Sequence, residues 1–513
     1  MADPTPLLPH STSSDPISTP PISLDSVIER VTTNSAWPQL LQAILVSLSW
    51  FFDGQQTFIT VYTDAEPTWH CTEHPNTTCR STSNICDLST SAWAWDRPSS
   101  TTIISDFNLQ CASSLISGLP ASAFFFGCLL GGFILATLAD SSLGRRNLLF
   151  LSCFTMCVAS LITAFSTNVF VYATLRFISG FGRASIGACA LVLSTEIVSR
   201  KWRGRIGIAG FFCFTFGFLS LPGIAYVNRY SSWRTLYMWT SVPGILYCVL
   251  VFLFVSESPK WLFTRGRKDE AVATLGRLGH WNHSSLNLYL SSIPLLEESA
   301  EVDLFSSLKN LFEKKWAFRR TLALMSVGFG VGMVYYGMPL GVGNLGFNIY
   351  LSLTLNAMSE IPSFALTLFF IGKWYRKSSL LTFMMISGVC SIMCVVVSSK
   401  WLQIGLEIVS FFSANTAFSI LMIYTLELFP TCVRNSATSM VRQGLVIGAI
   451  FSPVLISAGR NYNEFFSYGV FGVVIICCGV FVFSLPETKG VALCDTMDEQ
   501  ERKEVADQIN TSV

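Results

Sequence analysis

Long apolar runs separated by short polar stretches follow one another along this chain from about residue 39 to residue 484. Each run is about 20 residues long or longer, the length at which an α-helix crosses a hydrocarbon core of ~30 Å. Several runs contain Gly and Pro, which membrane helices tolerate better than soluble ones. The pattern predicts an all-α, polytopic membrane protein with twelve transmembrane helices, at residues 39–60, 113–138, 147–166, 169–193, 206–227, 235–255, 321–341, 343–371, 379–398, 401–424, 440–459 and 464–484.

A long hydrophilic segment divides these runs into two groups of six. Lys and Arg outside the runs concentrate in the segments that a cytosolic N-terminus would place in the cytosol, as the positive-inside rule requires. Residues 1–30 are polar and rich in Pro and Ser, so we expect no cleavable signal peptide. We expect a disordered cytosolic N-tail (1–37), an N-terminal six-helix half (38–255) with a large non-cytosolic loop (61–112), a cytosolic linker (256–320), a C-terminal six-helix half (321–485) and a cytosolic C-tail (486–513).

The two halves repeat the same polar motifs at a nearly constant offset. "TEIVSRKWRG" follows the fourth run and "LELFPTCVRN" the tenth, so that Glu196 and Arg203 match Glu427 and Arg434 at an offset of 231 residues. "SESPKWL" follows the sixth run and "LPETKG" the twelfth, and "GRR" follows the second run as "GKWYRK" follows the eighth. The repetition predicts two pseudo-symmetric six-helix halves around a midplane cavity, an architecture of transporters that work by rocking.

The non-cytosolic loop carries its own chemistry. Four of the sixteen cysteines lie in it or at its border, and on this side of the membrane an even number suggests disulfides. Four cysteines allow three pairings, and the sequence does not choose between them. The loop also holds the sequon at Asn76, either a glycosylation site or an unused match. The disulfide candidates are Cys71, Cys79, Cys86 and Cys111.

Motifs distributed over nearly the whole chain after residue 38 resemble those of the major facilitator superfamily. They include "LADSSLGRR", "RFISGFG", "EIVSRKWRG", "SESPKWL", "YYGMPL", "SEIP", "ELFPTCVRN" and "LPETKG". "YYG", "ELFPTCVRN" and the large cysteine-bearing first loop make the chain most similar to the plant organic cation/carnitine transporter family. The resemblance implies a secondary transporter of organic cations.

The chain departs from the family pattern at several positions. In the loop after the second helix, Ala136 replaces a Gly, Ser141 replaces an Arg, and one residue is inserted before Gly144. In the eleventh helix, Val446 stands where animal relatives have an aspartate linked to cation binding, and Arg442 lies one turn earlier. These departures weaken the expectation that the family's cytosolic loop geometry and its cation specificity apply to this chain.

Asp53 and Arg176 are candidates for proton coupling. Ionisable groups inside apolar runs are costly and usually face a cavity or a partner. The resemblance implies the pairing, because proton-coupled sugar porters join an Asp of the first helix to an Arg in an Arg-x-x-x-Gly setting of the fourth, as in Arg176 to Gly180. Burial raises a carboxylate pKa and a guanidinium lowers it, so such an acid can take and release a proton. The alternative is a static ion pair that only holds the two helices together.

A second set of residues is predicted to contact the substrate. Glu360, within "SEIP", is a cation-binding carboxylate by resemblance, although it could instead cap a kinked helix or pair with Arg442. Two tyrosines of the seventh helix offer ring faces to a quaternary ammonium, unless they only pack. Glu407 is nearer a helix end, and we interpret it as structural. The full set is Glu360, Tyr335, Tyr336, Gln55, Gln56 and Arg442.

Charged residues at the cytosolic helix ends are predicted to be gating latches. Salt bridges between the halves would hold an outward-facing state and break on inward opening; the alternative is that these groups are solvated loop ends. The latch residues are Asp140, Arg145, Arg146, Glu196, Arg203, Glu427 and Arg434.

Other motifs exclude other classes of protein. "GVGNLG" lies between apolar runs rather than in a strand–turn–helix unit, so we expect no nucleotide site there. The chain has no phosphate-binding Gly-Lys-Ser/Thr loop and no evident nucleophile–base pair, so we predict neither an ATP-driven pump nor an enzyme. "HCTEH" fits a disulfide better than a metal site. We expect no cofactor, no metal and no nucleic-acid partner.

We therefore predict a secondary active transporter of organic cations, including carnitine, that works by alternating access with possible proton coupling. Its partners are a small organic cation or zwitterion, protons and the lipid bilayer, and we expect a monomer. The alternatives are a sugar/proton symporter on the same fold and a non-transporting nutrient sensor. Asp3 followed by Leu7 and Leu8 fits an acidic dileucine signal, which favours the vacuolar membrane over the plasma membrane.

Overall fold

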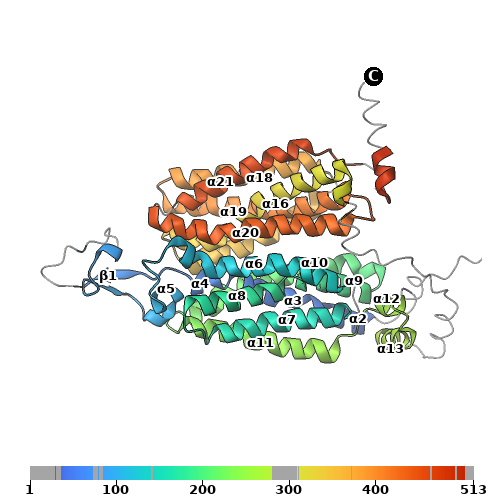
Figure 1. Ribbon diagram of the computed structural model, residues 1–513, viewed down its shortest axis with the longest axis horizontal. Coiled ribbons are helices and arrows are strands. Elements are labelled where there is room, and N and C mark those ends of the chain that lie inside the picture. Colours follow the sequence, from blue (N-terminus) through green and yellow to red (C-terminus); the bar gives the residue numbers. More distant parts are fainter. Residues whose placement is uncertain are drawn as a thin grey trace, which may run out of the picture.

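The computed structural model describes residues 36–72, 85–139, 143–279, 311–370, 373–462, 465–490 and 494–502, together with residues 29, 79 and 309. Its helices form two bundles that lie side by side with their long axes roughly parallel (Figure 1). One bundle contains the helices up to residue 254 and the other those from residue 315 onward. The predicted division into two six-helix halves is confirmed.

In the N-terminal half the first membrane helix is split into α2 (Ala36–Ser47), α3 (Ser49–Phe58) and α4 (Thr60–Thr63). The residues at both breaks, Leu48 and Ile59, keep right-handed helical dihedrals, so the chain crosses as one interrupted helix. The remaining helices of this half are α6 (Ser114–Ala139), α7 (Arg145–Thr163), α8 (Val169–Arg183) with α9 (Ile186–Ile197), α10 (Arg200–Val227) and α11 (Trp233–Phe254).

The C-terminal half begins with a helix that ends in a short 3-10 turn. Gly346 follows this turn with a positive φ of 59°, a conformation open to glycine, and this bend separates the seventh membrane helix from the eighth. The elements of this half are α16 (Lys315–Gly341) with η3 (Val342–Leu345), α17 (Ile349–Phe370), α18 (Arg376–Val396), α19 (Lys400–Leu428), α20 (Arg434–Tyr462) and α21 (Phe466–Gly479) with η4 (Val480–Ser484).

Ten segments of the described chain are long and apolar enough to cross a membrane, with α8–α9 and α16–η3 each counting as one. The other two of the twelve predicted spans are the interrupted first helix and α17. Helix α17 carries Ser352, Asn356 and Glu360 at intervals of four residues, all fully buried. This spacing places the three polar side chains on one face of the helix, turned into the protein rather than toward lipid.

Close helix packing in both halves depends on glycine. A Cβ added to Gly180 of α8 would lie 1.9 Å from the carbonyl oxygen of Phe124 on α6, and one added to Gly332 of α16 would lie 2.1 Å from that of Leu445 on α20. Small residues allow such close backbone approach in membrane bundles. Any larger residue at either position would force the helices apart.

The two ends of the bundles differ in character. At one end the external loop forms a two-stranded antiparallel sheet, β1 (Trp69–Cys71) with β2 (Trp93–Trp95), in which His70 faces Ala94. Three short helices complete the described part of this loop: η1 (Ile85–Asp87), η2 (Ser99–Thr101) and α5 (Ile103–Asp106). Within the described residues, the small sheet is the one departure from the predicted all-α class.

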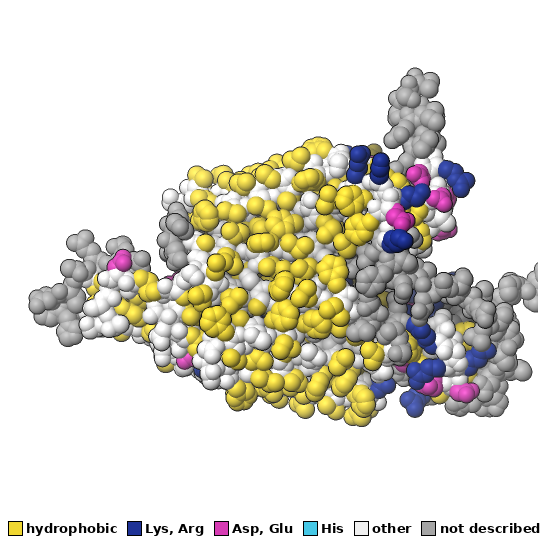
Figure 2. Space-filling model, viewed as in Figure 1, with side chains coloured by type: hydrophobic (Ala, Val, Ile, Leu, Met, Phe, Trp, Pro, Cys, Tyr) yellow, Lys and Arg dark blue, Asp and Glu magenta, His cyan; other side chains and the backbone are white. Residues whose placement is uncertain are grey.

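At the opposite end lie α12 (Pro259–Thr264) and α13 (Lys268–Gly279), which belong to the predicted cytosolic linker. Lys and Arg side chains gather at this end, whereas hydrophobic side chains cover much of the face of the two bundles that Figure 2 shows. The distribution matches a membrane span with a basic cytosolic face.

Candidate functional site

Glu360 lies at the centre of the protein, where the two halves meet. Its carboxylate accepts a hydrogen bond of 2.8 Å from the hydroxyl of Tyr335 on α16 and one of 2.7 Å from Thr215 on α10. Thr215 belongs to the N-terminal half, so this fully buried carboxylate links the halves. Both donors are neutral, so no basic side chain of the described residues is hydrogen-bonded to this carboxylate.

Aromatic rings surround this carboxylate. The ring of Tyr335 stacks on Phe411 at 5.4 Å and on Phe418 at 5.6 Å, and it meets Tyr336 edge to face at 4.9 Å. Rings of the N-terminal half complete the enclosure: Phe58 stacks on Phe218 at 4.0 Å, and Phe125 lies 4.9 Å from Tyr336. Ring faces beside a carboxylate suit a quaternary ammonium group.

Asp53 on α3 forms its ion pair with Arg183 on α8, rather than with the predicted partner Arg176. The Nε of Arg183 contacts Oδ1 of Asp53, and Nη2 lies 3.4 Å from Oδ2. Arg183 stands seven residues after Arg176, about two helical turns, so both arginines project from a similar face of α8. The depth at which α3 packs against α8 decides which of them meets the carboxylate.

Arg176 is fully buried in a different environment. Its Nη2 donates a hydrogen bond of 2.9 Å to the backbone carbonyl of Gln56, and its guanidinium lies 4.2 Å from the ring centroid of Phe124. Its Nε and Nη1 have no hydrogen-bond partner within the described part of the protein. A cation–π contact thus replaces the carboxylate that the sequence predicted.

The other predicted substrate residues divide between two environments. Gln55 donates to Ser220 at 2.8 Å and Gln56 to Thr240 at 3.2 Å, so both amides are engaged within the N-terminal half. Arg442, on α20, is exposed although it lies in a spanning helix. It interacts electrostatically with Asp53, and its Nη2 lies 3.3 Å from where a Cβ of Gly187 would be. Its exposed side chain therefore lies between the two halves, near Asp53 and Gly187.

The external side of the site is closed by an aromatic contact between the halves. Tyr350, at the start of α17, stacks on Tyr62 of α4 at 5.4 Å and meets Tyr226 of α10 edge to face at 5.5 Å. Nη1 of Arg97 in the external loop donates to the hydroxyl of Tyr350 at 3.5 Å. These tyrosines were not among the predicted site residues, because isolated tyrosines at helix ends carry no recognisable sequence pattern.

The cytosolic charges form contacts other than the predicted latches. Glu427 pairs with Arg376 at 3.0 Å instead of with Arg434, and both partners lie in the C-terminal half. Arg434 instead donates to the carbonyl of Phe429 at 3.3 Å. Oε2 of Glu196 and Nε of Arg203 have no hydrogen-bond partner within the described residues. Asp140 lies outside the described residues.

The internal repeat is also visible in the contacts of Glu257 and Glu487, the acids of the matching motifs "SESPKWL" and "LPETKG". Glu257 accepts hydrogen bonds of 3.1 Å from the backbone N–H of Arg146, at the start of α7. Glu487 accepts one of 2.8 Å from the N–H of Arg376 and one of 3.1 Å from that of Lys377, at the start of α18. Each carboxylate satisfies free N–H groups at a helix N-terminus and faces its positive end.

We expect Glu487→Ala to lower the stability of the folded protein by about 1–3 kcal/mol, because the N–H groups at the start of α18 lose an ionised acceptor. Glu257→Ala has a smaller expected effect. Burial has the larger influence and raises the pKa of Glu257, while the N–H groups of Ser258 and Arg146 lower it. The cost of desolvating this carboxylate therefore offsets part of the stabilisation that its hydrogen bonds provide. Thermal unfolding in detergent checks both values; an unchanged Glu487→Ala would contradict the assigned role.

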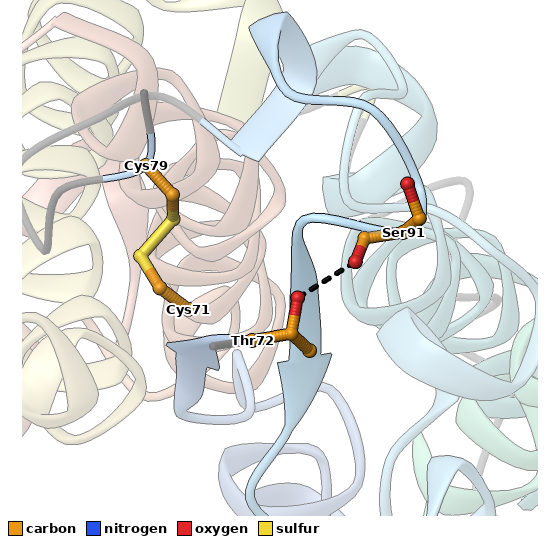
Figure 3. The surroundings of a disulfide bond; sticks show 4 residues. All are labelled: Cys71, Thr72, Cys79 and Ser91. Carbon is orange, nitrogen blue, oxygen red and sulfur yellow. Dashed lines mark hydrogen bonds between the residues drawn. A yellow bond between two sulfur atoms is a disulfide. The ribbon is translucent and has the colours of Figure 1, made fainter. Parts of the chain in front are cut away.

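The external loop contains two disulfides. The structure joins Cys71 to Cys79 and Cys86 to Cys111, one of the three pairings that the sequence left open. Beside the first of them, the hydroxyl of Thr72 donates to the carbonyl of Ser91 at 2.6 Å and ties the strand to the loop (Figure 3). The predicted glycosylation site, Asn76, lies outside the described residues.

An ion pair fixes this loop to the bundle. Asp106, in α5, accepts hydrogen bonds of 2.7 Å from Arg234 and 3.1 Å from the indole of Trp233, both at the start of α11. The loop thus has a fixed position at the external end of the N-terminal half.

Comparisons with known proteins agree with this arrangement. The family described as "Sugar (and other) transporter" matches residues 59–499. The chain is 54% identical to "Organic cation/carnitine transporter 3" of Arabidopsis thaliana over 99% of both chains, and 52% identical to "Organic cation/carnitine transporter 2" of the same plant over 98% of both. Its fold matches the inward-open xylose transporter of E. coli with a TM-score of 0.63 and 16% identity, over 88% of this chain and 97% of that one. The chain is thus a multi-pass membrane protein of the major facilitator superfamily, and it belongs to the plant organic cation/carnitine transporter family.

Proposed function

We propose that this protein carries organic cations, including zwitterionic carnitine, across a membrane by alternating access. The observation that carries the proposal is Glu360, a buried carboxylate held by two neutral donors inside an aromatic enclosure at the junction of the halves. The names of the plant relatives support this substrate class. A site for sugars would be lined mainly by amides and hydroxyls.

Carnitine has a carboxylate as well as an ammonium group. In our proposal the ammonium group lies against Glu360 and the rings, while Arg442 receives the carboxylate. Arg442 suits this role because its side chain is exposed between the halves, and because a guanidinium binds a carboxylate through two parallel hydrogen bonds.

The proposed transport cycle alternates between this arrangement, closed externally by Tyr62, Tyr226 and Tyr350, and one in which that contact has opened. Asp53 is the proposed coupling acid of the N-terminal half. Its pairing with Arg183 favours the ionised form, and protonation would release the pair. We further propose that the protein acts as a monomer in the vacuolar membrane and is glycosylated at Asn76.

Uptake into proteoliposomes tests the proposal. Labelled carnitine, labelled choline and labelled glucose are compared with and without a proton gradient. We expect uptake of the two ammonium compounds and none of glucose. Glucose uptake alone would favour the sugar symporter, and no uptake by a folded protein in any condition would favour the sensor.

A further inference from the structure

Glu407 of α19 lies inside the C-terminal half, away from the contacts of Glu360. Its side chain is fully buried, and its Oε1 accepts a hydrogen bond of 2.9 Å from Nδ2 of Asn356 on α17. Its other oxygen, Oε2, has no hydrogen-bond partner within the described part of the chain. A buried carboxylate is stable only when it is paired, fully hydrogen-bonded or neutral.

Among the described residues, no basic group neutralises this carboxylate. The one side chain that forms a hydrogen bond with it is that of Asn356. The titratable groups that interact with it electrostatically are the thiol of Cys394 on α18 and the phenol of Tyr468 on α21. Helices α16 and α20 also pack against α19. In their described residues, neither helix has a titratable group that interacts electrostatically with Glu407.

The amide of Asn356 also has one atom without a hydrogen-bond partner. Its Oδ1 is also buried without a hydrogen-bond partner in the described structure, although its Nδ2 is engaged with Glu407. With Glu407 ionised, two acceptors, Oε2 and Oδ1, remain unsatisfied in the same pair of side chains. A proton on Oε2 would turn it into a donor, so that the acid would offer a donor and an acceptor to an amide that offers the same.

We propose that Glu407 and Asn356 form a proton-binding site in the C-terminal half, separate from Asp53, in which Glu407 carries the proton in the present conformation. Asn356 is one helical turn from Glu360 on the same face of α17. Movement of α17 during transport would therefore change both sites together. The link to transport rests on the proposed function, whereas the protonation itself does not.

Infrared spectroscopy of the purified protein tests the protonation without any substrate. We expect the carbonyl band of a protonated carboxylic acid at neutral pH, and we expect Glu407→Gln to remove it. Glutamine places an N–H₂ group where the protonated oxygen was, so this variant should fold, as size-exclusion chromatography would show. Glu427→Gln, which neutralises the ion-paired acid at the cytosolic end of the same helix, is the matched control and should keep the band.

Loss of the band in Glu407→Gln but not in Glu427→Gln supports the site. A band of unchanged intensity in Glu407→Gln, or no such band in the wild-type protein, overturns it. A wild-type band that shifts slowly in ²H₂O adds evidence of burial without relying on any variant.

Carnitine exchange and gradient-driven accumulation test the link to transport. Glu407→Gln should keep exchange across a membrane without a gradient and lose part of the proton-driven accumulation, and full accumulation would refute the link. If the wild-type protein exchanges no cation at all, the proposed function fails while the infrared result still decides the proton site.

Discussion

Glu360→Gln is expected to weaken the uptake of organic cations by about 10- to 100-fold while leaving the protein folded. Glutamine has the size of glutamate and keeps one oxygen, so one of the two hydroxyls of Tyr335 and Thr215 retains its acceptor. The other hydroxyl can turn and accept from the new amide N–H₂ group. The variant therefore removes the negative charge without opening a cavity. A charge-assisted contact contributes about 1.5–3 kcal/mol, and each 1.4 kcal/mol corresponds to about tenfold in affinity.

The concentration dependence of labelled choline and carnitine uptake measures this loss. Two controls separate charge from shape. Glu360→Asp keeps the charge at a shorter reach and should retain part of the uptake. Tyr335→Phe removes one donor but keeps the ring that stacks on Phe411 and Phe418, so its effect should be smaller than that of Glu360→Gln. Unchanged cation uptake by Glu360→Gln would show that Glu360 is structural.

From the sequence, the site residues could be assigned to their helices, but their contacts with other helices could not be predicted. Apolar runs, intramembrane charges and the repeat were enough to place Glu360, Tyr335 and Asp53 inside a two-half bundle. They could not specify which side chains of different helices meet, because the depth of packing is a tertiary property. Asp53 could face Arg176 or Arg183 from the same helix face, and the family motif favoured the former.

The repeat shows the same limit in another way. The matching motifs "SESPKWL" and "LPETKG" contain Glu257 and Glu487, but the motifs do not show that each acid binds the start of a helix in its own half. The contacts of the predicted latch residues show a related limit. Glu427 and Arg434 are close in sequence, yet Arg376 reaches Glu427 from the start of another helix. Charged groups near a helix end have several partners within reach, and the sequence does not rank them.

Asp53→Asn is expected to destabilise the folded protein by about 3–5 kcal/mol, the range for removing one partner of a buried ion pair. The side chains of Asp53 and Arg183 are only 5% and 10% exposed, so solvent does little to replace the lost charge. Arg442 also interacts electrostatically with Asp53, and the variant would leave two guanidinium groups facing a neutral amide. Arg183→Gln should cost less, because Arg442 remains near the carboxylate.

The double variant Asp53→Asn/Arg183→Gln separates the structural role of the pair from proton coupling. It leaves no uncompensated charge at this position, so we expect thermal unfolding to recover most of the stability that Asp53→Asn loses. Carnitine exchange without a gradient should return with the fold. Accumulation driven by a proton gradient should not return, because the N-terminal half then lacks its titratable acid. If accumulation recovers together with stability, Asp53 only holds α3 against α8, and the coupling proton binds elsewhere.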